Sequence, residues 1–126
     1  MTGEQILVVE DNEKNMKLFR DVLAATGYRT LEATTGGEAV DMASEHTPDL
    51  VLMDIQLPDL DGVEALRRLR ADARTATIPV LALTAQAMRG DRERFLTEGF
   101  DGYLSKPVNV RELIGVVRAH CEGRLG

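Results

Sequence analysis

Short apolar runs recur along the chain, and each is followed by a segment whose apolar residues are spaced as on one face of a helix. The runs lie at residues 6–9, 30–33, 50–53, 79–83 and 103–104. The first and third are apolar throughout, which is typical of strands buried on both faces of a sheet. Five strands alternating with five helices over short connections predict an α/β fold, a doubly wound (βα)5 parallel sheet with helices on both faces.

Start and stop signals support these helices. Asn12 or Asp11 can cap the first helix and Gly27 can end it, while residues 109–112 form an Asn-x-x-Glu capping box for the last. Gly36-Gly37 opens the second helix, which closes before Pro48. The apolar face of the first helix is assigned to Leu18, Phe19, Val22 and Leu23, and the helix within residues 92–100 carries Phe95, Leu96 and Phe100.

Length and composition predict a single domain, residues 1–126 with a core of about 5–122, and no output domain. The net charge of −6 argues against non-specific binding to nucleic acid or anionic membranes, and the arginines are interleaved with acidic residues. A single cysteine, Cys121, fits a reducing compartment. The sequence contains no signal peptide or membrane span, so we expect a cytoplasmic protein.

Charged and polar residues stand where the predicted strands end. Glu10 and Asp11 follow the first strand and Asp54 the third. Thr84 follows the fourth strand and Lys106 the fifth. Because ligands bind beyond the carboxyl ends of the strands in a doubly wound sheet, these side chains are expected to share one rim.

Three carboxylates on one rim call for a cation. At about 4 Å apart, each pair repels by roughly 4 kcal/mol at an effective dielectric constant near 20. Oxygen ligands with room for water suit Mg²⁺. A carboxylate is also a nucleophile that can accept a phosphoryl group, a reaction that needs mainly positioning and charge neutralisation. Lys106 could supply part of that charge, and the Thr84 hydroxyl a hydrogen bond.

These residues resemble a known family, the receiver domains of two-component response regulators, over essentially the whole chain. The resemblance rests on Val9-Glu10-Asp11-Asn12, Leu52-Met53-Asp54-Ile55-Gln56-Leu57-Pro58, Gly62, Leu83-Thr84-Ala85 and Ser105-Lys106-Pro107. It implies the flavodoxin-like strand order 2-1-3-4-5. It also implies a signalling switch rather than an enzyme, limited to self-catalysed phosphotransfer and autodephosphorylation.

The resemblance assigns roles to the acidic residues. It implies that Asp54 is the phospho-acceptor and that Glu10 and Asp11 hold Mg²⁺ together with Asp54, Glu10 through water. The backbone carbonyl of Gln56 would complete the metal site.

The same resemblance gives roles to the residues after the last two strands. Thr84 and the backbone of Ala85 would bind phosphoryl oxygens, and Lys106 would pair with one of them. A cis peptide is expected before Pro107, and Tyr103 is expected to turn inward on activation with Thr84. The side chains of Gln56 and Gln86 are further expected to border the site and to influence the lifetime of the phosphate.

Residues 12–19 and 84–91 are similar to the DivK type of single-domain receiver. That resemblance implies a sensor histidine kinase or phosphotransfer protein as donor and a downstream protein target, with a monomer or a weak phosphorylation-dependent dimer. The target face would lie on helix four, strand five and helix five, and would include Arg92, Phe95, Tyr103 and Val116.

Three other functions agree less well with the sequence. A phosphorylation-independent adaptor would keep the fold but usually lacks one of the acidic, Thr or Lys positions, all of which are present here. A hydrolase of the haloacid dehalogenase type would place Asp-x-Asp after the first strand, where this chain has Glu10-Asp11-Asn12. A flavodoxin is disfavoured because the turn after the first strand is acidic.

Overall fold

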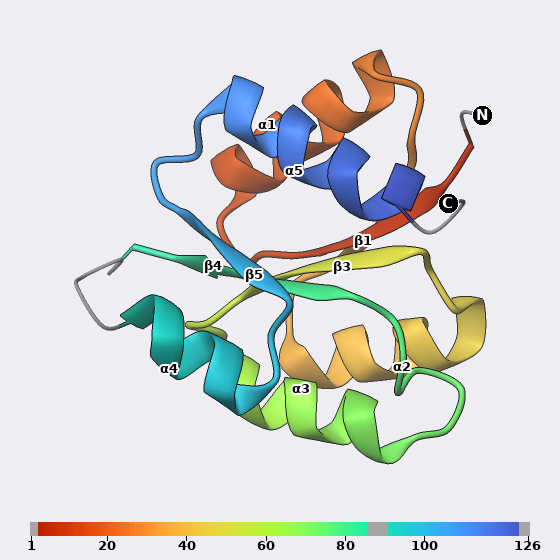
Figure 1. The fold of residues 1–126 in the computed structure, drawn as a ribbon, viewed down its shortest axis with the longest axis vertical. Coiled ribbons are helices and arrows are strands. Elements are labelled where there is room, and N and C mark those ends of the chain that lie inside the picture. The colour runs from red at the N-terminus through yellow and green to blue at the C-terminus, as the bar shows by residue number, and fades with distance from the viewer. Residues whose placement is uncertain (1–2, 86–90, 124–126) are drawn as a thin grey trace.

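The computed structural model describes residues 3–85 and 91–123. Within them, five strands alternate with five helices (Figure 1). The strands are β1 (Gln5–Val9), β2 (Arg29–Ala33), β3 (Leu50–Asp54), β4 (Val80–Thr84) and β5 (Gly102–Ser105). The helices are α1 (Glu13–Ala25), α2 (Gly36–His46), α3 (Gly62–Ala71), α4 (Asp91–Glu98) and α5 (Val110–Gly123).

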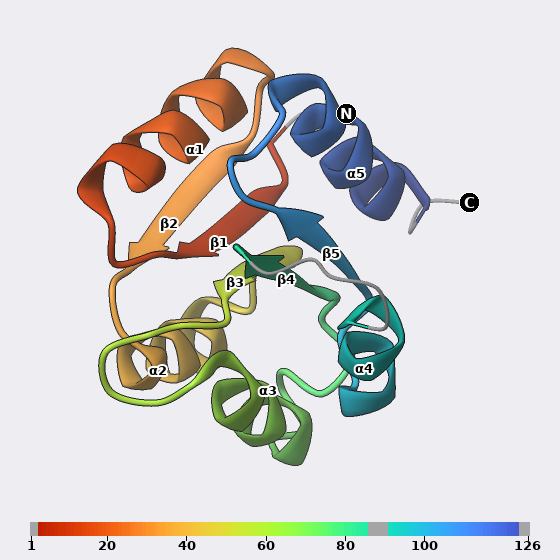
Figure 2. The same cartoon turned by 90° about the vertical axis from the view of Figure 1, so that its left-hand side faces the viewer.

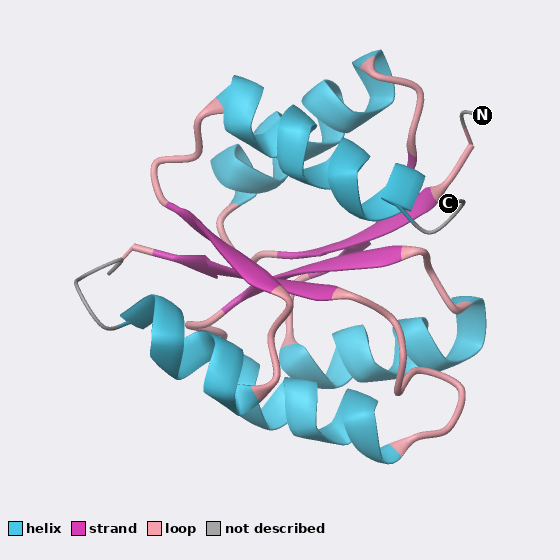
Figure 3. Ribbon diagram, in the orientation of Figure 1, coloured by secondary structure: helices cyan, strands magenta, loops and turns pink. Residues whose placement is uncertain are grey.

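The strands form one parallel sheet in the order β2-β1-β3-β4-β5, which confirms the predicted topology. α1 and α5 cover one face of the sheet, and α2, α3 and α4 cover the other (Figures 1 and 3). The predicted strands and helices are all present, with boundaries that differ by one or two residues at several ends.

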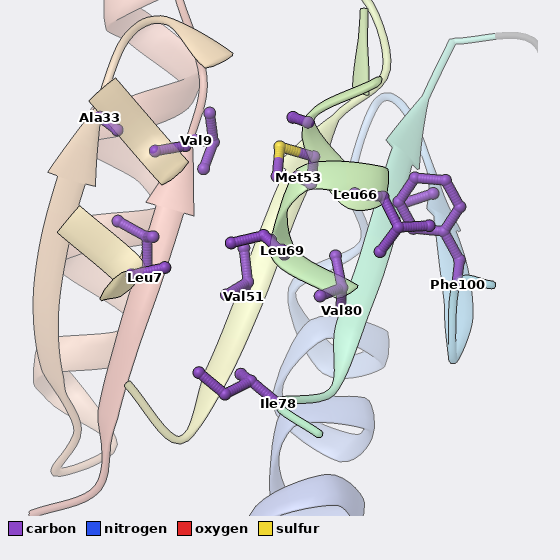
Figure 4. Packing of buried hydrophobic residues seen from close by; sticks show 14 of the residues in the cluster. Leu7, Val9, Ala33, Val51, Met53, Leu66, Leu69, Ile78, Val80 and Phe100 are labelled. Carbon is purple, nitrogen blue, oxygen red and sulfur yellow. The ribbon is translucent and has the colours of Figure 1, made fainter. Parts of the chain in front are cut away.

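Alternate residues of the central strands enter two separate hydrophobic clusters, one on each face of the sheet. Leu7, Val51 and Val80 point toward the helical layer of α2 and α3, where they meet Leu66 and Leu69 (Figure 4). Their neighbours along the strands pack against α1 and α5. This two-sided burial explains why the strands read as continuous apolar runs.

One residue assigned to the apolar face of α1 is wrong. Leu18 is 36% exposed, and the buried face of α1 consists of Met16, Phe19 and Leu23. Positions 16, 19 and 23 follow the three- and four-residue spacing of a helix stripe, and residue 18 falls outside it. Leu96 in α4 is 44% exposed, although its neighbour Phe95 is buried.

The caps of the helices follow the sequence closely. The Asn12 side chain accepts a hydrogen bond from Asn15 N at 3.0 Å, so Asn12 caps α1 and leaves Asp11 available to the rim. Asn109 accepts from Glu112 N at 3.0 Å before α5. Of the helices described by the structure, none has the length and apolar character needed to cross a membrane.

Candidate functional site

The register of the sheet brings the polar strand ends together. Val9 is paired with Met53, so Glu10 and Asp54 follow on adjacent strands. On the other side, Asp54 is paired with Leu83, and Thr84 with Ser105. Figure 2 faces this end of the sheet, where the loops from β1 to α1 and from β3 to α3 begin. The rim predicted from the sequence therefore forms.

Lys106 links two of the buried acids. Its Nζ lies 2.6 Å from Glu10 Oε1 and 2.8 Å from Asp54 Oδ2. Glu10 is fully buried and Asp54 is 4% exposed. Charged groups so far removed from water need partners, and one ammonium serves both carboxylates.

Asp11 adds a third carboxylate to this pair. One carboxylate oxygen each from Glu10, Asp11 and Asp54 lies within 4.8 Å of the other two, and Asp11 is exposed to solvent. This cluster, the acid cluster, offers only oxygen ligands and is open to water on one side. Those donors fit Mg²⁺, which prefers carboxylates and retains several waters.

The charges change the protonation of the buried groups. Burial raises the pKa of the Glu10 carboxyl, and the neighbouring Asp54 adds to the rise, while Lys106 acts against it. Burial by itself lowers the pKa of the Lys106 ammonium, but the hydrogen bonds to Asp54 and Glu10 outweigh that effect and raise it. Lys106 is therefore held as a cation at neutral pH.

The β3–α3 loop approaches the acid cluster through its backbone. Gln56 N donates to Asp54 Oδ1 at 2.9 Å, and Gly62 N donates to Ile55 O at 2.9 Å. A Cβ on Gly62 would lie 2.7 Å from Asp54 O and 2.9 Å from Ile55 Cα. Glycine is needed at 62 because two backbone segments pass too closely for any side chain.

The other predicted residues also have defined places. Thr84 is buried at the end of β4, and its carbonyl accepts from Lys106 N at 2.7 Å. Ala85 is exposed directly after it, and the Lys106-Pro107 peptide is cis as expected. Gln56 is exposed, and Gln86 lies outside the described residues. Their expected effect on phosphate lifetime stays a prediction.

Asn15 is a site residue whose role was missed in the sequence. Its Nδ2 donates to Glu10 Oε1 at 3.2 Å, while Asn12 N donates to Glu10 Oε2 at 3.3 Å. Residue 15 lies in the first turn of α1, which begins at Glu13. The sequence signal for this contact was an amide side chain four residues after the acidic pair Glu10-Asp11.

The expected target face is partly formed by other residues than predicted. A groove of about 440 Å³ runs between α4, β5 and α5, and Leu96, Tyr103, Glu112 and Val116 are among its lining residues. Phe95 does not belong to this surface, because it is 1% exposed and packs edge-on against Phe100 with ring centroids 6.0 Å apart. Tyr103 is half-buried, and the Arg92 side chain lies outside the description.

Comparison with known proteins agrees with this geometry. Residues 6–118 match the family described as the response regulator receiver domain. The polar-differentiation response regulator DivK of Brucella ovis is 48% identical over 117 residues, which are 93% of this chain and 95% of the relative. The DivK of Brucella anthropi is equally similar.

Solved structures share the fold. One is the receiver domain of a sensor histidine kinase from Pseudomonas aeruginosa with a magnesium ion coordinated in its active-site cleft (39% identity, TM-score 0.88, covering 96% of this chain and 99% of that one). Another is a response regulator from Chloroflexus aurantiacus (30% identity, TM-score 0.89, covering 96% and 99%). With its strand order, its acid cluster and its match over residues 6–118, the chain belongs to the response regulator receiver family.

Proposed function

We propose that the protein is a Mg²⁺-dependent phospho-acceptor in which Asp54 takes a phosphoryl group from a phosphohistidine of a sensor kinase or phosphotransfer protein. The observation that carries the proposal is the acid cluster with Lys106 bound to Asp54 at 2.8 Å. It joins a nucleophile, a candidate cation site and a positive charge at one rim.

In the chemical step, the phosphoryl group moves from a ring nitrogen of the donor histidine to an oxygen of Asp54. An oxygen of the Asp54 carboxylate forms a bond to phosphorus as the bond from phosphorus to the donor imidazole nitrogen breaks. The electron pair of that bond stays on the nitrogen, and the donor, which carries a proton on its other ring nitrogen, leaves as neutral histidine. The product on this chain is an acyl phosphate at Asp54.

Each neighbouring group has a part in this step. Glu10 and Asp11 would hold Mg²⁺ with Asp54 and the Gln56 carbonyl, and the bound ion would neutralise charge on the phosphoryl oxygens. Lys106 would exchange its contact with Asp54 for one with a phosphoryl oxygen. The Thr84 hydroxyl and the backbone N–H of Ala85 would donate hydrogen bonds to the other oxygens.

The signal would leave the molecule through a protein partner that binds the groove between α4, β5 and α5. Tyr103 lines this groove and also packs near Phe95, with ring centroids 6.2 Å apart. A change of Tyr103 packing would therefore alter the groove, which supports its proposed role as the switch residue together with Thr84.

The direct test is phosphorylation by acetyl phosphate. Wild-type protein with Mg²⁺ should give a phosphorylated species on a phosphate-affinity gel, and excess chelator should abolish it. Asp54→Asn should not be labelled, whereas Asp41→Asn, an exposed aspartate on α2, should be labelled like wild type. Labelling that survives in Asp54→Asn or in chelator would overturn the proposal, and failure of wild type to label would favour the adaptor.

A further inference from the structure

The loop that follows the phospho-acceptor strand is tied to the start of a helix on a different βα unit. The Asp59 carboxylate accepts hydrogen bonds from Gly36 N at 2.7 Å and from Gly37 N at 2.9 Å. Leu60 packs over the same glycine, since a Cβ on Gly36 would lie 2.9 Å from Leu60 Cδ1. Figure 2 shows this loop passing beside α2 on its way from β3 to α3.

Asp59 is not the ordinary cap of α2. The N-cap is Thr35, whose side chain accepts from Glu38 N at 3.1 Å. The first two N–H groups of the helix would still lack partners, and Asp59 accepts from both. A carboxylate at this place is also favoured by the helix dipole, and the N–H groups of Gly37 and Gly36 lower the pKa of Asp59. The contact therefore joins a fully ionised group to two fixed donors.

The same loop carries the proposed metal ligand. Its base is fixed by the bond from Gln56 N to Asp54 Oδ1 and by the bond from Gly62 N to Ile55 O. Between these two points residues 57–61 cross the surface, and the Asp59 contact holds their tip. A loop fastened at base and tip leaves the Gln56 peptide fewer orientations than one fastened at its base alone.

From these contacts we infer that Asp59 is a positioning residue for Mg²⁺ binding, which holds the β3–α3 loop on the start of α2 and so preorganises the Gln56 carbonyl at the acid cluster. The inference rests on the proposed function. Asp59 does not touch the metal. It lowers the ordering cost that the loop would otherwise meet when the ion binds.

The measurement is Mg²⁺ affinity, determined by amide NMR titration of protein whose spectrum shows it to be folded. Loss of groups that orient metal ligands typically costs about 10–100-fold in affinity, and Asp59 acts at one remove. We therefore expect Asp59→Ala to weaken Mg²⁺ binding by about threefold to tenfold. Asp59→Asn, which keeps one acceptor oxygen, should fall between Asp59→Ala and wild type.

Thr35→Ala is the matched control for helix capping. It removes a cap from the same helix but leaves the contact between the loop and α2 in place. Its Mg²⁺ affinity should equal that of wild type even though its stability falls. An equal loss of affinity in Thr35→Ala and Asp59→Ala would assign the effect to α2 itself and overturn the inference.

Measurements at low and high ionic strength distinguish a positioning effect of Asp59 on Mg²⁺ affinity from a purely electrostatic one. Asp59 is exposed, so a purely electrostatic effect of its charge on Mg²⁺ would shrink strongly between low and high ionic strength. A positioning effect keeps its fold-change. A difference between Asp59→Ala and wild type that disappears in high salt would overturn the inference.

Coupling between two sites is reciprocal, which gives a second readout. If the contact strengthens Mg²⁺ binding, Mg²⁺ must strengthen the contact, so hydrogen exchange at the Gly36 and Gly37 amides should slow when the ion is added to wild type. If Mg²⁺ binds but exchange at the Gly36 and Gly37 amides does not change, the inference about Asp59 is contradicted and the proposed function is not. Failure of wild type to bind Mg²⁺ at all would overturn the proposed function and the inference with it.

Discussion

Two polar clusters lie at opposite ends of the same sheet and balance their charges differently. At the carboxyl ends of the strands, Lys106 is shared between Glu10 and Asp54, with Asp11 nearby. At the amino ends, Arg70 donates to Asp101 Oδ2 at 3.0 Å and also to backbone carbonyls, among them Ile78 O at 2.7 Å. Both clusters connect elements that are distant in sequence.

The difference lies in what each cluster leaves uncompensated. Arg70 and Asp101 form one positive and one negative charge, and Asp101 Oδ2 accepts from Val80 N at 2.8 Å as well. The acid cluster and Lys106 together carry three negative charges and one positive among the described residues, a net charge of −2. A fold tolerates such a surplus where a cation can bind, so we expect the Arg70–Asp101 cluster to contribute to stability and the acid cluster to hold a cation.

The largest expected effect on stability comes from disrupting the Arg70–Asp101 cluster. Arg70→Ala removes the partner of Asp101 and the donors to the carbonyls of Ile78 and Gly99. Hydrogen bonds of charged groups contribute about 1.5–3 kcal/mol each, reduced here because the side chain is partly exposed. We expect Arg70→Ala to lower the free energy of unfolding in urea by about 2–3 kcal/mol.

Arg68→Ala is the control for this change, because Arg68 lies on the same helix and its contact, Glu64, is also on the surface. Exposed ion pairs contribute about 0–1 kcal/mol, so Arg68→Ala should change stability by less than about 0.5 kcal/mol. Equal losses in the two variants would show that the amino-end cluster has no special role in stability.

The acid cluster should respond with the opposite sign. In the absence of Mg²⁺, the Asp54 charge is repelled by Glu10 and Asp11 and attracted by the Lys106 ammonium and the Gln56 N–H. An asparagine at 54 would lose both repulsions but keep an acceptor oxygen, so we expect Asp54→Asn to raise the free energy of unfolding by about 1 kcal/mol. The measurement is thermal or urea unfolding in chelator.

Asp101→Asn and added Mg²⁺ sharpen that result. Asp101→Asn removes the charge that balances Arg70 and should lower stability by about 1 kcal/mol. Mg²⁺ should stabilise wild type by mass action and should stabilise Asp54→Asn much less. The difference in free energy of unfolding between the two proteins should therefore become smaller or change sign when Mg²⁺ is added. If both Asp→Asn changes had the same sign in chelator, the contrast between the clusters would be wrong.

A smaller effect is expected at Asn15. Its amide is a neutral donor to Glu10, so Asn15→Ala should lower the free energy of unfolding by about 0.5–1 kcal/mol in chelator. Asn15→Asp should lower it further, because a fourth carboxylate would then face Glu10. An Asn15→Asp variant as stable as wild type would mean that the acid cluster is better screened than its distances indicate.

These residues also mark what could be read from the sequence. The rim followed from strand ends, because parallel strands bring their carboxyl ends to one edge and the apolar runs locate those ends. The contact between Asn15 and Glu10 was not predicted, because it depends on the side-chain rotamer of Asn15 as well as on its spacing from the acidic pair. Burial within helices was also underdetermined: Leu18 and Phe19 are both apolar, but only the rotation of α1 about its axis decides which of them faces the sheet.

Asp59 belongs to the loop beside the acid cluster. Its charge is nevertheless compensated, as that of Asp101 is, because it accepts hydrogen bonds from two backbone N–H groups. They lower its pKa below the ordinary value of 3.8, so the unfolded chain binds the proton more tightly. Its contribution to stability is complete above pH 3.8 and is lost as the pH falls through the folded pKa. Asp59→Asn should therefore be less stable than wild type at neutral pH, opposite in sign to Asp54→Asn in chelator. Urea unfolding of wild type and Asp59→Asn at neutral pH and at about pH 3 should show that the difference in their free energies of unfolding becomes smaller in acid. A difference that does not depend on pH would mean that the carboxylate charge contributes nothing to the contact with α2.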